Sequence, residues 1–284
     1  MNFQKTAAAI HDISGLGKCS LTAALPVLSA AGVSVGVLPT AVLSTQTGGL
    51  NNYTYRDLTD EIPGIMNHWD SIGVKFDAVY SGFLGSEMQV GLVSEFVRKF
   101  SKPDAVFLCD PAMADNGKLY DTFDADFIEQ MKKLCMKADI IVPNFTEAAM
   151  LLDEEYVLPP YSDRYVTDLV VKLAGRFNSR YIVLTGVQFD EDKIGAVAYD
   201  SEKCEISYSF RDKVEGMFHS TGDLFASSLL GAFLNGHDIF SSVEIALSFT
   251  VSAINKTVEL GGDSRFGLSF ELCLPDYMRN LGVL

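Results

Sequence analysis

Short apolar runs alternate along this chain with longer segments of helical periodicity. The runs are typical of buried strands, and they cover Thr6–Ile10, Val33–Val42, Ala78–Ser81, Ala105–Cys109, Ile140–Val142 and Tyr181–Thr185. The longer segments repeat apolar residues every three or four positions and predict helices over Ser20–Ala31, Glu87–Phe100, Asp124–Lys137, Thr146–Leu152 and Tyr165–Phe177. Strands that alternate with helices in this way predict an α/β fold, with a mostly parallel sheet and helices on both faces.

The last third of the chain departs from this alternation. Ile194–Tyr199 and Glu205–Phe210 are two strand-like runs joined by a short polar segment, so we predict a hairpin at the sheet edge. The pattern after them is helical throughout, over Leu224–Leu234, Ser241–Leu260 and Leu268–Arg279. Because no repeat, linker or low-complexity tract divides the sequence, we predict a single domain over residues 1–284.

Composition narrows the classes of function. The chain has 284 residues, 48% of them apolar and 21% charged, as expected of a globular enzyme. Its net charge of −15 argues against a nucleic-acid or anionic-membrane partner. The uncharged stretch from Cys19 to Tyr55 is interrupted by Pro26 and Gly32, so it is too short for a membrane helix. Five cysteines without metal-ligand spacing, and no apolar leader, favour reduced thiols and a cytoplasmic location.

The most informative motif joins a polar turn to an apolar helix. Ser220, Thr221, Gly222 and Asp223 directly precede the helical run Leu224–Leu234. The unpaired N–H groups at a helix start attract anions, and glycine permits close approach of the backbone to a ligand. A carboxylate beside a phosphate site suits phosphoryl transfer to an alcohol. The alternative is that Thr221 or Asp223 only caps the helix.

A second group of polar residues follows the predicted strands in the middle of the chain. Asp110 and Asp115 come after one apolar strand, and Asn144 and Glu147 begin the helix after the next. Carboxyl ends of parallel strands are where open α/β sheets bind ligands. Oxygen ligands of this kind suit Mg²⁺, often through water. A helix-capping arrangement of Asn144 and Glu147 is the alternative.

The glycine-containing turn after the first strand fits neither common nucleotide motif. Gly15 and Gly17 match the dinucleotide-binding pattern, but Ser20 takes its last position. No acidic residue ends the second strand to hold a ribose hydroxyl, so NAD binding is not expected. Asp12 and Cys19 occupy positions that a P-loop needs for glycine and for serine or threonine.

With these motifs in order, the sequence resembles the pyridoxal/pyridoxamine kinase family of the ribokinase-like superfamily. The resemblance runs from about Lys5 to about Tyr277. It is carried by Cys109–Lys118 (CDPAMADNGK), Val142–Ala148 (VPNFTEA), Val183–Gly186 (VLTG), Ser220–Asp223 (STGD) and Arg265–Glu271 (RFGLSFE). The resemblance implies a ribokinase-like fold and ATP-dependent phosphorylation of the hydroxymethyl group of pyridoxal, pyridoxamine or pyridoxine.

The resemblance also implies roles for individual residues. Asp223 would be the general base, and the backbone of Ser220, Thr221 and Gly222 would cradle the transferring phosphoryl group. The family usually has glycine where this chain has Ser220, and serine costs energy there if the turn needs a positive φ.

The implied substrate contacts come from three segments. Asp12 and Ser14 follow the first strand, Thr47 follows the second, and Phe83 takes a position where many members have tyrosine. Many pyridoxal kinases have serine where this chain has Asp12. An aspartate there is closer to the hydroxymethylpyrimidine (phosphate) kinases, which remain the alternative function.

The implied nucleotide and metal contacts lie in the second half. Asp115, Asn144, Thr185, Phe218 and Thr221 would meet ATP. Asp110, Asn144 and Glu147 would serve Mg²⁺. The resemblance further implies a homodimer, and leaves open whether a monovalent cation is required. A sugar kinase and a catalytically silent nucleotide-binding regulator are the remaining alternatives.

Overall fold

The computed structural model describes residues 4–284, and its centre is a nine-stranded sheet in the order β11-β10-β9-β8-β5-β4-β1-β2-β3. Its strands are β1 (Thr6–Leu16), β2 (Ser34–Thr45), β3 (Tyr55–Asp57), β4 (Phe76–Ser81), β5 (Ser101–Cys109), β8 (Ile140–Ile141), β9 (Tyr181–Val187), β10 (Lys193–Asp200) and β11 (Glu205–Asp212). Two short strands, β6 (Ala114–Asp115) and β7 (Lys118–Leu119), pair separately. The mostly parallel sheet is confirmed, because only β3, β10 and β11 pair antiparallel within it.

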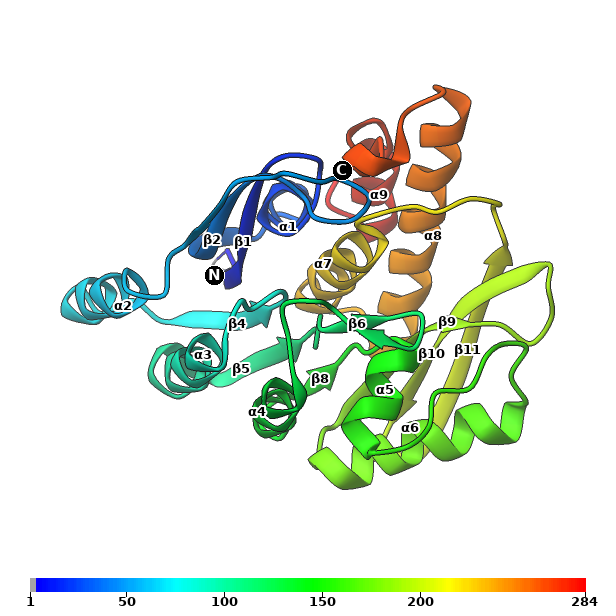
Figure 1. Ribbon diagram of the computed structural model, residues 1–284, viewed down its shortest axis with the longest axis horizontal. Helices are drawn as coiled ribbons and strands as arrows, with labels where there is room; N and C mark the ends of the chain where they lie inside the picture. The colour runs from blue at the N-terminus through cyan, green and yellow to red at the C-terminus, as the bar shows by residue number, and fades with distance from the viewer. Residues whose placement is uncertain (1–3) are drawn as a thin grey trace.

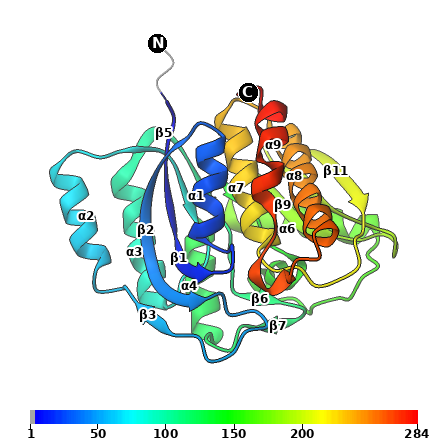
Figure 2. The ribbon, with the colours of Figure 1, turned by 90° about the horizontal axis from the view of Figure 1, so that it is seen from above.

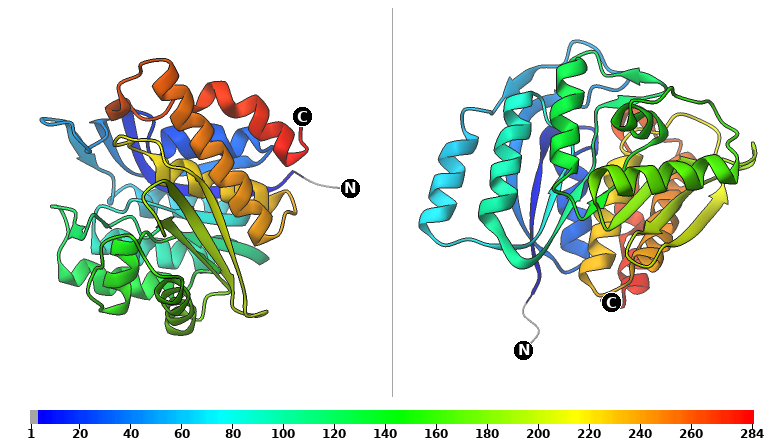
Figure 3. Two further views of the ribbon diagram at one scale, coloured as in Figure 1. Left: turned by 90° about the vertical axis from the view of Figure 1, so that its right-hand side faces the viewer. Right: turned by 90° about the horizontal axis from the view of Figure 1, so that it is seen from below.

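Helices cover both faces of the sheet (Figures 1 and 3). They are α1 (Leu21–Ala30), α2 (Ile62–Ser71), α3 (Glu87–Phe100), α4 (Ala125–Cys135), α5 (Phe145–Leu152), α6 (Asp163–Phe177), α7 (Thr221–Leu234), α8 (Ile239–Glu259) and α9 (Leu274–Leu281). Figure 2 shows α1, α7, α8 and α9 together on one face. Helices α2 to α6 lie on the other, so the fold has the three layers that the alternation predicts.

Each face of the sheet has its own apolar core, because successive strand residues point to opposite sides. Ala8 and Ile10 of β1 pack into the core under α2 to α6, and Ala7 packs into the core under α1, α7, α8 and α9. The latter core includes Leu224 and Leu229 of α7. Burial of α7 explains why its sequence is almost entirely apolar: it lies between the sheet and its neighbouring helices.

Several predicted boundaries were wrong. Strand β1 continues through Asp12 and Ser14 to Leu16, paired with β2 around a bulge between His11 and Ile13. The turn expected after Ile10 therefore begins only at Gly17. The predicted helix over Leu268–Arg279 begins only at Leu274, with α9, because Phe270–Cys273 form the 3₁₀ segment η2. The 3₁₀ segment η1 (Ser264–Phe266) precedes the predicted range.

Five elements carried no sequence prediction: β3, α2, β6, β7 and η1. One predicted pairing of strands is confirmed. The short edge strand β3 and the helix α2 lie in the segment after Gly48 that we left unassigned. The hairpin β10–β11 forms the opposite edge, as predicted. Ser86 caps α3 through its hydroxyl, which accepts a hydrogen bond from the N–H of Gln89, as its sequence position indicates.

Candidate active site

The predicted site residues lie mainly where the parallel strands end. Asp110 directly follows β5, Asn144 follows β8 at the start of α5, and Thr185 lies near the end of β9. Helix α7 begins at the same edge with Thr221, three residues earlier than predicted. This is the edge at which open α/β sheets bind ligands.

The turn that enters α7 has the features of an open anion site. Ser220 is in the left-handed conformation, with φ 68° and ψ 14°, so serine bears the strain expected for this position. No side chain in residues 4–284 caps the first N–H groups of α7. A Cβ added to Gly222 would meet nothing within 4 Å, and that glycine has no positive φ. Gly222 thus keeps the space in front of the helix open.

Asp223 does not cap its own helix. Its Oδ2 atom accepts hydrogen bonds from the backbone N–H of Ser20 (2.9 Å), the Cys19 thiol (3.3 Å) and the Ser220 hydroxyl (3.3 Å). All three donors contact the same oxygen. The capping alternative for Thr221 and Asp223 is therefore wrong, and Oδ1 of Asp223 accepts no hydrogen bond within residues 4–284.

Asp12 lies beside this turn, buried in β1. The Ser14 hydroxyl donates to its Oδ2 atom at 3.0 Å. Burial, together with the charge of the neighbouring Asp223, raises the pKa of Asp12 to about 6, although the hydrogen bond from Ser14 lowers it. Asp12 is therefore ionised near neutral pH and can accept a hydrogen bond from a positively charged or neutral N–H donor.

Asp110 is a second buried carboxylate at this edge, and it accepts no hydrogen bond from residues 4–284. Burial raises its pKa well above the usual value, and the charges of Glu147 and Asp223 add to the rise. Carboxylates held this close without a cation repel one another. A divalent cation would relieve that repulsion, so the donor set around Asp110 fits Mg²⁺.

Asn144 and Glu147 form a complete capping box at the start of α5. The Asn144 side-chain oxygen accepts from the N–H of Glu147 at 2.9 Å, and the Glu147 carboxylate accepts from the N–H of Asn144 at 2.9 Å. The second Glu147 oxygen accepts from the N–H of Met113 at 3.2 Å. The capping alternative from the sequence is thus what the structure shows, and both oxygens of Glu147 are occupied by backbone donors.

Burial raises the pKa of Glu147 to about 8, although three backbone N–H groups lower it. The charge of Asp115 acts in the same direction as burial. Asp115 itself is exposed in β6, where it accepts hydrogen bonds from the backbone and side chain of Asn116. Thr185 pairs with Asn144 through an isolated β-bridge, which joins the end of β9 to the start of α5.

The loop after β2 contacts the anion turn through a histidine. A Cβ on Gly48 would lie 2.5 Å from Nδ1 of His219, so only glycine lets the loop backbone pack against that ring. The side chain of Gln46 donates to the carbonyl oxygens of Gly48 and Arg265. Thr47 is exposed at the tip of this loop.

The two aromatic candidates come from different segments of the chain. Phe83 is half-buried and packs against Phe123, with ring centroids 5.6 Å apart. Phe218 is half-buried at the start of the anion turn, next to Gly216.

Four residues of this site were missed as functional candidates. Cys19 and Ser20 donate hydrogen bonds to Asp223, and His11 and Tyr80 are buried, with side-chain polar atoms that have no partner in residues 4–284. Burial lowers the pKa of His11 to about 4. One signal was available for Ser20, because it occupies the last glycine position of the dinucleotide-binding pattern, where helix and strand approach closely. Its φ is 53°.

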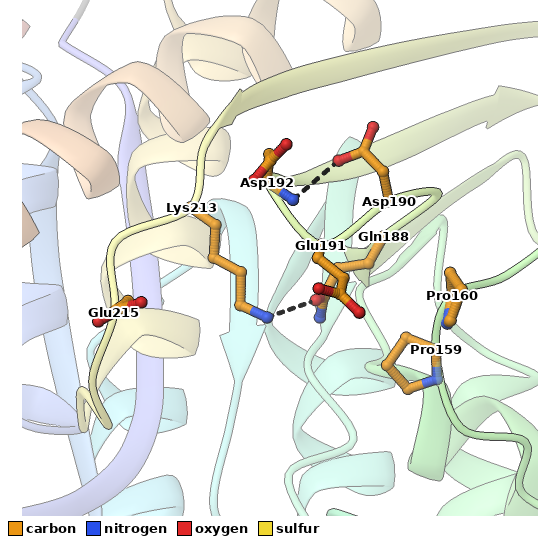
Figure 4. A pocket seen from close by; sticks show the side chains of 8 residues that line it. All are labelled: Pro159, Pro160, Gln188, Asp190, Glu191, Asp192, Lys213 and Glu215. Atoms are coloured by element: carbon orange, nitrogen blue, oxygen red, sulfur yellow. Dashed lines mark hydrogen bonds between the residues drawn. The ribbon is translucent and has the colours of Figure 1, made fainter.

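A cavity of 460 Å³ lies beyond the end of β9, on the side of Thr185 away from Asp12. Figure 4 shows Lys213 reaching toward Gln188, to which it donates a hydrogen bond of 2.8 Å. The other lining residues come from the β9–β10 loop, the loop before α6 and the segment after β11: Pro159, Pro160, Asp190, Glu191, Asp192 and Glu215.

Metal clusters and membrane-spanning helices are two further features to consider within residues 4–284. Among residues 4–284, no group of three or more His, Cys, Asp or Glu side chains is arranged to hold a metal ion by itself. An ion at Asp110 would therefore need ligands from water or from a bound phosphate chain. No helix in the same range is both long and apolar enough to cross a membrane.

Comparison with known proteins gives a consistent set of relatives. Human pyridoxal kinase is 27% identical over 203 residues, which cover 65% of this chain and 62% of that enzyme. Pyridoxal kinase PdxY of Actinobacillus pleuropneumoniae is 30% identical over 216 residues, with 72% and 71% covered. The matches span about three fifths of the length of the human, Sus scrofa and Schizosaccharomyces pombe relatives.

Solved structures agree over nearly the whole chain. A candidate phosphomethylpyrimidine kinase from Bacteroides thetaiotaomicron, in a crystal form with pyridoxal, has a TM-score of 0.91 at 35% identity and covers 99% of this chain and 96% of its own. Pyridoxal kinase from Lactobacillus plantarum has a TM-score of 0.89 at 28% identity, with 97% of each chain covered.

The resemblance to pyridoxal kinases and the ribokinase-like fold are thereby confirmed. The model of one family extends over most of the sequence, from residue 21 to residue 266. This protein belongs to the phosphomethylpyrimidine kinase family.

Proposed function

We propose that this protein is an ATP-dependent kinase that phosphorylates the hydroxymethyl group of a B6 vitamer: pyridoxal, pyridoxamine or pyridoxine. The observation that carries the proposal is the uncapped start of α7, with the carboxylate of Asp223 beside it. Open N–H groups suit a phosphate, and a carboxylate suits the proton of an alcohol. The pyridoxal-containing relative at 35% identity supports the substrate class.

In this proposal, different groups of the chain accept the proton and stabilise the transferring phosphoryl group. Asp223 accepts the proton of the attacking hydroxyl at Oδ1, since Oδ2 is already occupied by three donors. The backbone N–H groups from Ser220 to Asp223 stabilise the charge that develops on the transferring phosphoryl group. The open space at Gly222 leaves room for that group to approach.

The nucleotide would extend from the α7 turn along the edge of the sheet. Asp115, Asn144, Thr185, Phe218 and Thr221 are the proposed nucleotide contacts. Mg²⁺ bound with ATP would neutralise phosphate charge, and Asp110, Asn144 and Glu147 are the residues that would hold it, partly through water. Of these three, Asp110 has the carboxylate that accepts no hydrogen bond within the described chain. A homodimer remains a prediction of the family resemblance.

The vitamer ring would lie against Asp12 and Ser14, with Thr47 and Phe83 as further contacts. A second candidate function rests on Asp12. Its buried carboxylate can accept a hydrogen bond from an exocyclic amine as well as from a pyridine hydroxyl. That property also fits a hydroxymethylpyrimidine, and the matching family bears the name of the corresponding kinase.

One experiment tests both candidates. ADP release is followed with pyridoxal, pyridoxamine, pyridoxine and hydroxymethylpyrimidine, each at fixed Mg²⁺ and ATP, with Asp223→Asn as the matched inactive control. A B6 vitamer should give the highest kcat/KM. If only the pyrimidine is phosphorylated, the second candidate is correct, and if no alcohol increases ADP release over basal hydrolysis, both are wrong.

Asp12→Ser then sharpens the substrate assignment. A site that pairs a polar group rejects ligands that leave it unpaired, by up to about 10⁴-fold. We expect the substitution to change the ratio of kcat/KM between these alcohols, while basal ATP hydrolysis is unchanged. An equal decrease for every alcohol would make Asp12 a residue of general importance to the strand rather than one that selects the substrate.

A further inference from the structure

Gln46 lies directly after β2, and its side chain is buried although the next residue, Thr47, is exposed. Its side-chain nitrogen donates to the carbonyl oxygens of Gly48 (2.5 Å) and Arg265 (2.6 Å). Its side-chain oxygen accepts from the N–H of Gly48 at 2.5 Å. An amide nitrogen carries two hydrogens, so both donors of Gln46 are used. These bonds hold the side chain in one orientation between its own loop and the C-terminal part of the chain.

The backbone of Gln46 is joined to the end of β1. Its N–H donates to the carbonyl oxygen of Leu16 at 3.3 Å. A Cβ added to Gly17 would lie 3.0 Å from Cγ of Gln46, so glycine lets the turn after β1 pack closely against the glutamine. Gln46 therefore contacts its own loop, the turn after β1 and the segment around η1, three parts of the chain that are far apart in sequence.

The segment around η1 continues the connection to the turn after β1. The carbonyl oxygen of Phe266, the residue after Arg265, accepts from the N–H of Lys18 at 3.1 Å. A Cβ added to Gly267 would lie 2.9 Å from the backbone nitrogen and oxygen of Lys18, so the two backbones pack directly against each other. The Lys18 side chain also forms an ion pair with Glu271 at 2.8 Å. The position of Lys18 thus depends on the segment that Gln46 holds.

The turn that contains Lys18 also holds the proposed base. The two residues after Lys18 both donate to Oδ2 of Asp223: the Cys19 thiol at 3.3 Å and the Ser20 N–H at 2.9 Å. Hydrogen bonds between neighbouring residues therefore connect Gln46, through the segment around η1, to Asp223. Helix α1 starts after this turn and lies beside α7 on one face of the sheet (Figure 2).

The loop that contains Gln46 meets the anion turn a second time, at His219. A Cβ added to Gly48 would lie 2.5 Å from Nδ1 of His219, and one added to Gly49 would lie 3.5 Å from its Nε2 atom. The His219 ring thus lies against the backbone of the loop, one residue before Ser220. This contact limits movement of the loop toward α7, while the hydrogen bonds of Gln46 limit movement away from it.

We propose that Gln46 is a positioning residue that holds the loop with Thr47 at a fixed distance from Asp223. The proposal rests on the proposed function, because it assumes that Thr47 contacts the vitamer and that Asp223 takes the proton of its hydroxyl. Displacement of a reacting group by about 1 Å can cost about 10²-fold in rate. Loss of the Gln46 hydrogen bonds should therefore misplace the vitamer relative to the base and leave ATP binding intact.

Gln46→Met tests this role directly. Methionine is an unbranched side chain that fills the same space and donates no hydrogen bond, while the backbone bond to Leu16 remains. We expect the KM for the vitamer to rise by about 10-fold and kcat to fall by about 10-fold. The KM for ATP and the basal ATP hydrolysis should stay within about twofold of wild type.

Gln46→Glu is a second variant with a different chemical change. It keeps the oxygen that accepts from Gly48 and places another oxygen against the carbonyl groups of Gly48 and Arg265. Its effect on the vitamer KM should equal or exceed that of Gln46→Met. If either variant is folded and keeps the wild-type KM and kcat for the vitamer, Gln46 does not position the loop.

Asn235→Leu is the matched control. The side-chain nitrogen of Asn235 also donates to two carbonyl oxygens, those of Ala31 (2.9 Å) and Gly231 (2.8 Å), near the C-terminal ends of α1 and α7. Its loss should lower the unfolding temperature, as Gln46→Met does, but leave kcat and the vitamer KM within about twofold of wild type. An equal rise of the vitamer KM in Asn235→Leu would overturn the proposal, because loss of stability alone would then explain it.

Hydrogen exchange of the free protein tests the connection without turnover. The N–H groups of Gly48 and Lys18 should both exchange about 10-fold faster in Gln46→Met, because their acceptors are lost or loosened. The N–H of Ala24, bonded within the start of α1, should exchange as in wild type. Unchanged exchange at Lys18 would overturn the proposal. Failure of the proposed function would instead appear as a wild-type protein that phosphorylates none of the tested alcohols, with these exchange differences still present.

Discussion

Helices α5 and α7 both begin at the edge of the sheet where the site lies, and they begin in opposite ways. At α5, Asn144 and Glu147 satisfy each other's backbone N–H groups in a complete capping box. At α7, no side chain of the described residues caps the helix. Asp223 also lies three residues past the N-cap position, but it contacts Ser20 and Cys19 instead of its own helix. The acidic residue of one start stabilises its helix, while that of the other is held by the turn before α1.

This comparison shows how similar sequence signals acquire different roles. Both starts have a polar residue followed three positions later by a carboxylate, which is the pattern of a capping box. At α5 the N-cap residue has extended backbone angles, and the carboxylate can reach back to its N–H. At α7 the N-cap residue Ser220 is left-handed, and a turn from β1 occupies Oδ2 of Asp223. The open helix start is therefore the one to test for catalysis.

Asp223→Asn should have the largest effect. It removes the general base, so kcat should fall by about 10²–10⁴-fold, while the asparagine oxygen still accepts from Ser20 and the fold remains. Single-turnover phosphorylation of the vitamer, with thermal unfolding as the control, measures this. A variant that keeps a third of wild-type kcat would remove Asp223 from the chemical step.

Gly222→Val should have the next largest effect. The new side chain would fill the open space in front of α7, and loss of one backbone donor of this kind costs about 10²–10³-fold in kcat. Valine also has a lower helix preference than alanine, so Gly222→Ala serves as a smaller control. Kinetics like wild type in a folded Gly222→Val protein would mean that the phosphates bind elsewhere.

Asp110→Asn and Glu147→Gln test whether the capping carboxylate at the start of α5 or the free carboxylate after β5 holds the metal. Asp110 has an unoccupied carboxylate, so its loss should shift the Mg²⁺ dependence of activity at fixed ATP to higher concentration by about 10-fold or more. Glu147 is occupied by backbone donors, so Glu147→Gln should mainly lower the free energy of unfolding, by about 0.5–2 kcal/mol. The larger Mg²⁺ shift in Glu147→Gln would reverse this assignment.

The smallest effect concerns the pH dependence of stability. The folded pKa of Glu147, about 8, lies above its unfolded value of 4.5, so its contribution is present at low pH and is lost as pH rises through 8. Between pH 8 and pH 6.5 the free energy of unfolding should rise by about 1–2 kcal/mol. Burial lowers the pKa of His11 to about 4, so its protonation opposes this gain only below its unfolded value of 6.5.

Urea unfolding at pH 6.5, 7.2 and 8 measures this dependence. Glu147→Gln should reduce this dependence, because glutamine does not titrate, and Asp110, whose pKa burial also raises, should account for the remainder. If the wild-type protein is equally stable at pH 6.5 and pH 8, Glu147 is already ionised in the folded state.

The layered architecture was predictable because the spacing of apolar residues within a segment indicates whether that segment forms a strand or a helix. The β10–β11 hairpin and the buried α7 were recognised in this way. Boundaries that depend on a distant partner were not. Asp12 and Ser14 read as a polar turn, yet they are in β1, because β2 offers hydrogen-bond partners as far as Thr45. Phe270 and its neighbours read as a helix, but packing against the other helices leaves only a 3₁₀ turn there.

The sequence by itself determined the order of the elements, the chemistry available at the sheet edge and the family, because these depend on residue identity and short-range spacing. Only the tertiary structure decided which carboxylate does what. Glu147 and Asp223 look alike in sequence, and they differ because Met113 and Asn144 surround one while Cys19 and Ser20 hold the other. Ser20 is 203 positions from Asp223 along the chain. No local pattern encodes such a contact, since it exists only when the sheet brings β1 and α7 together.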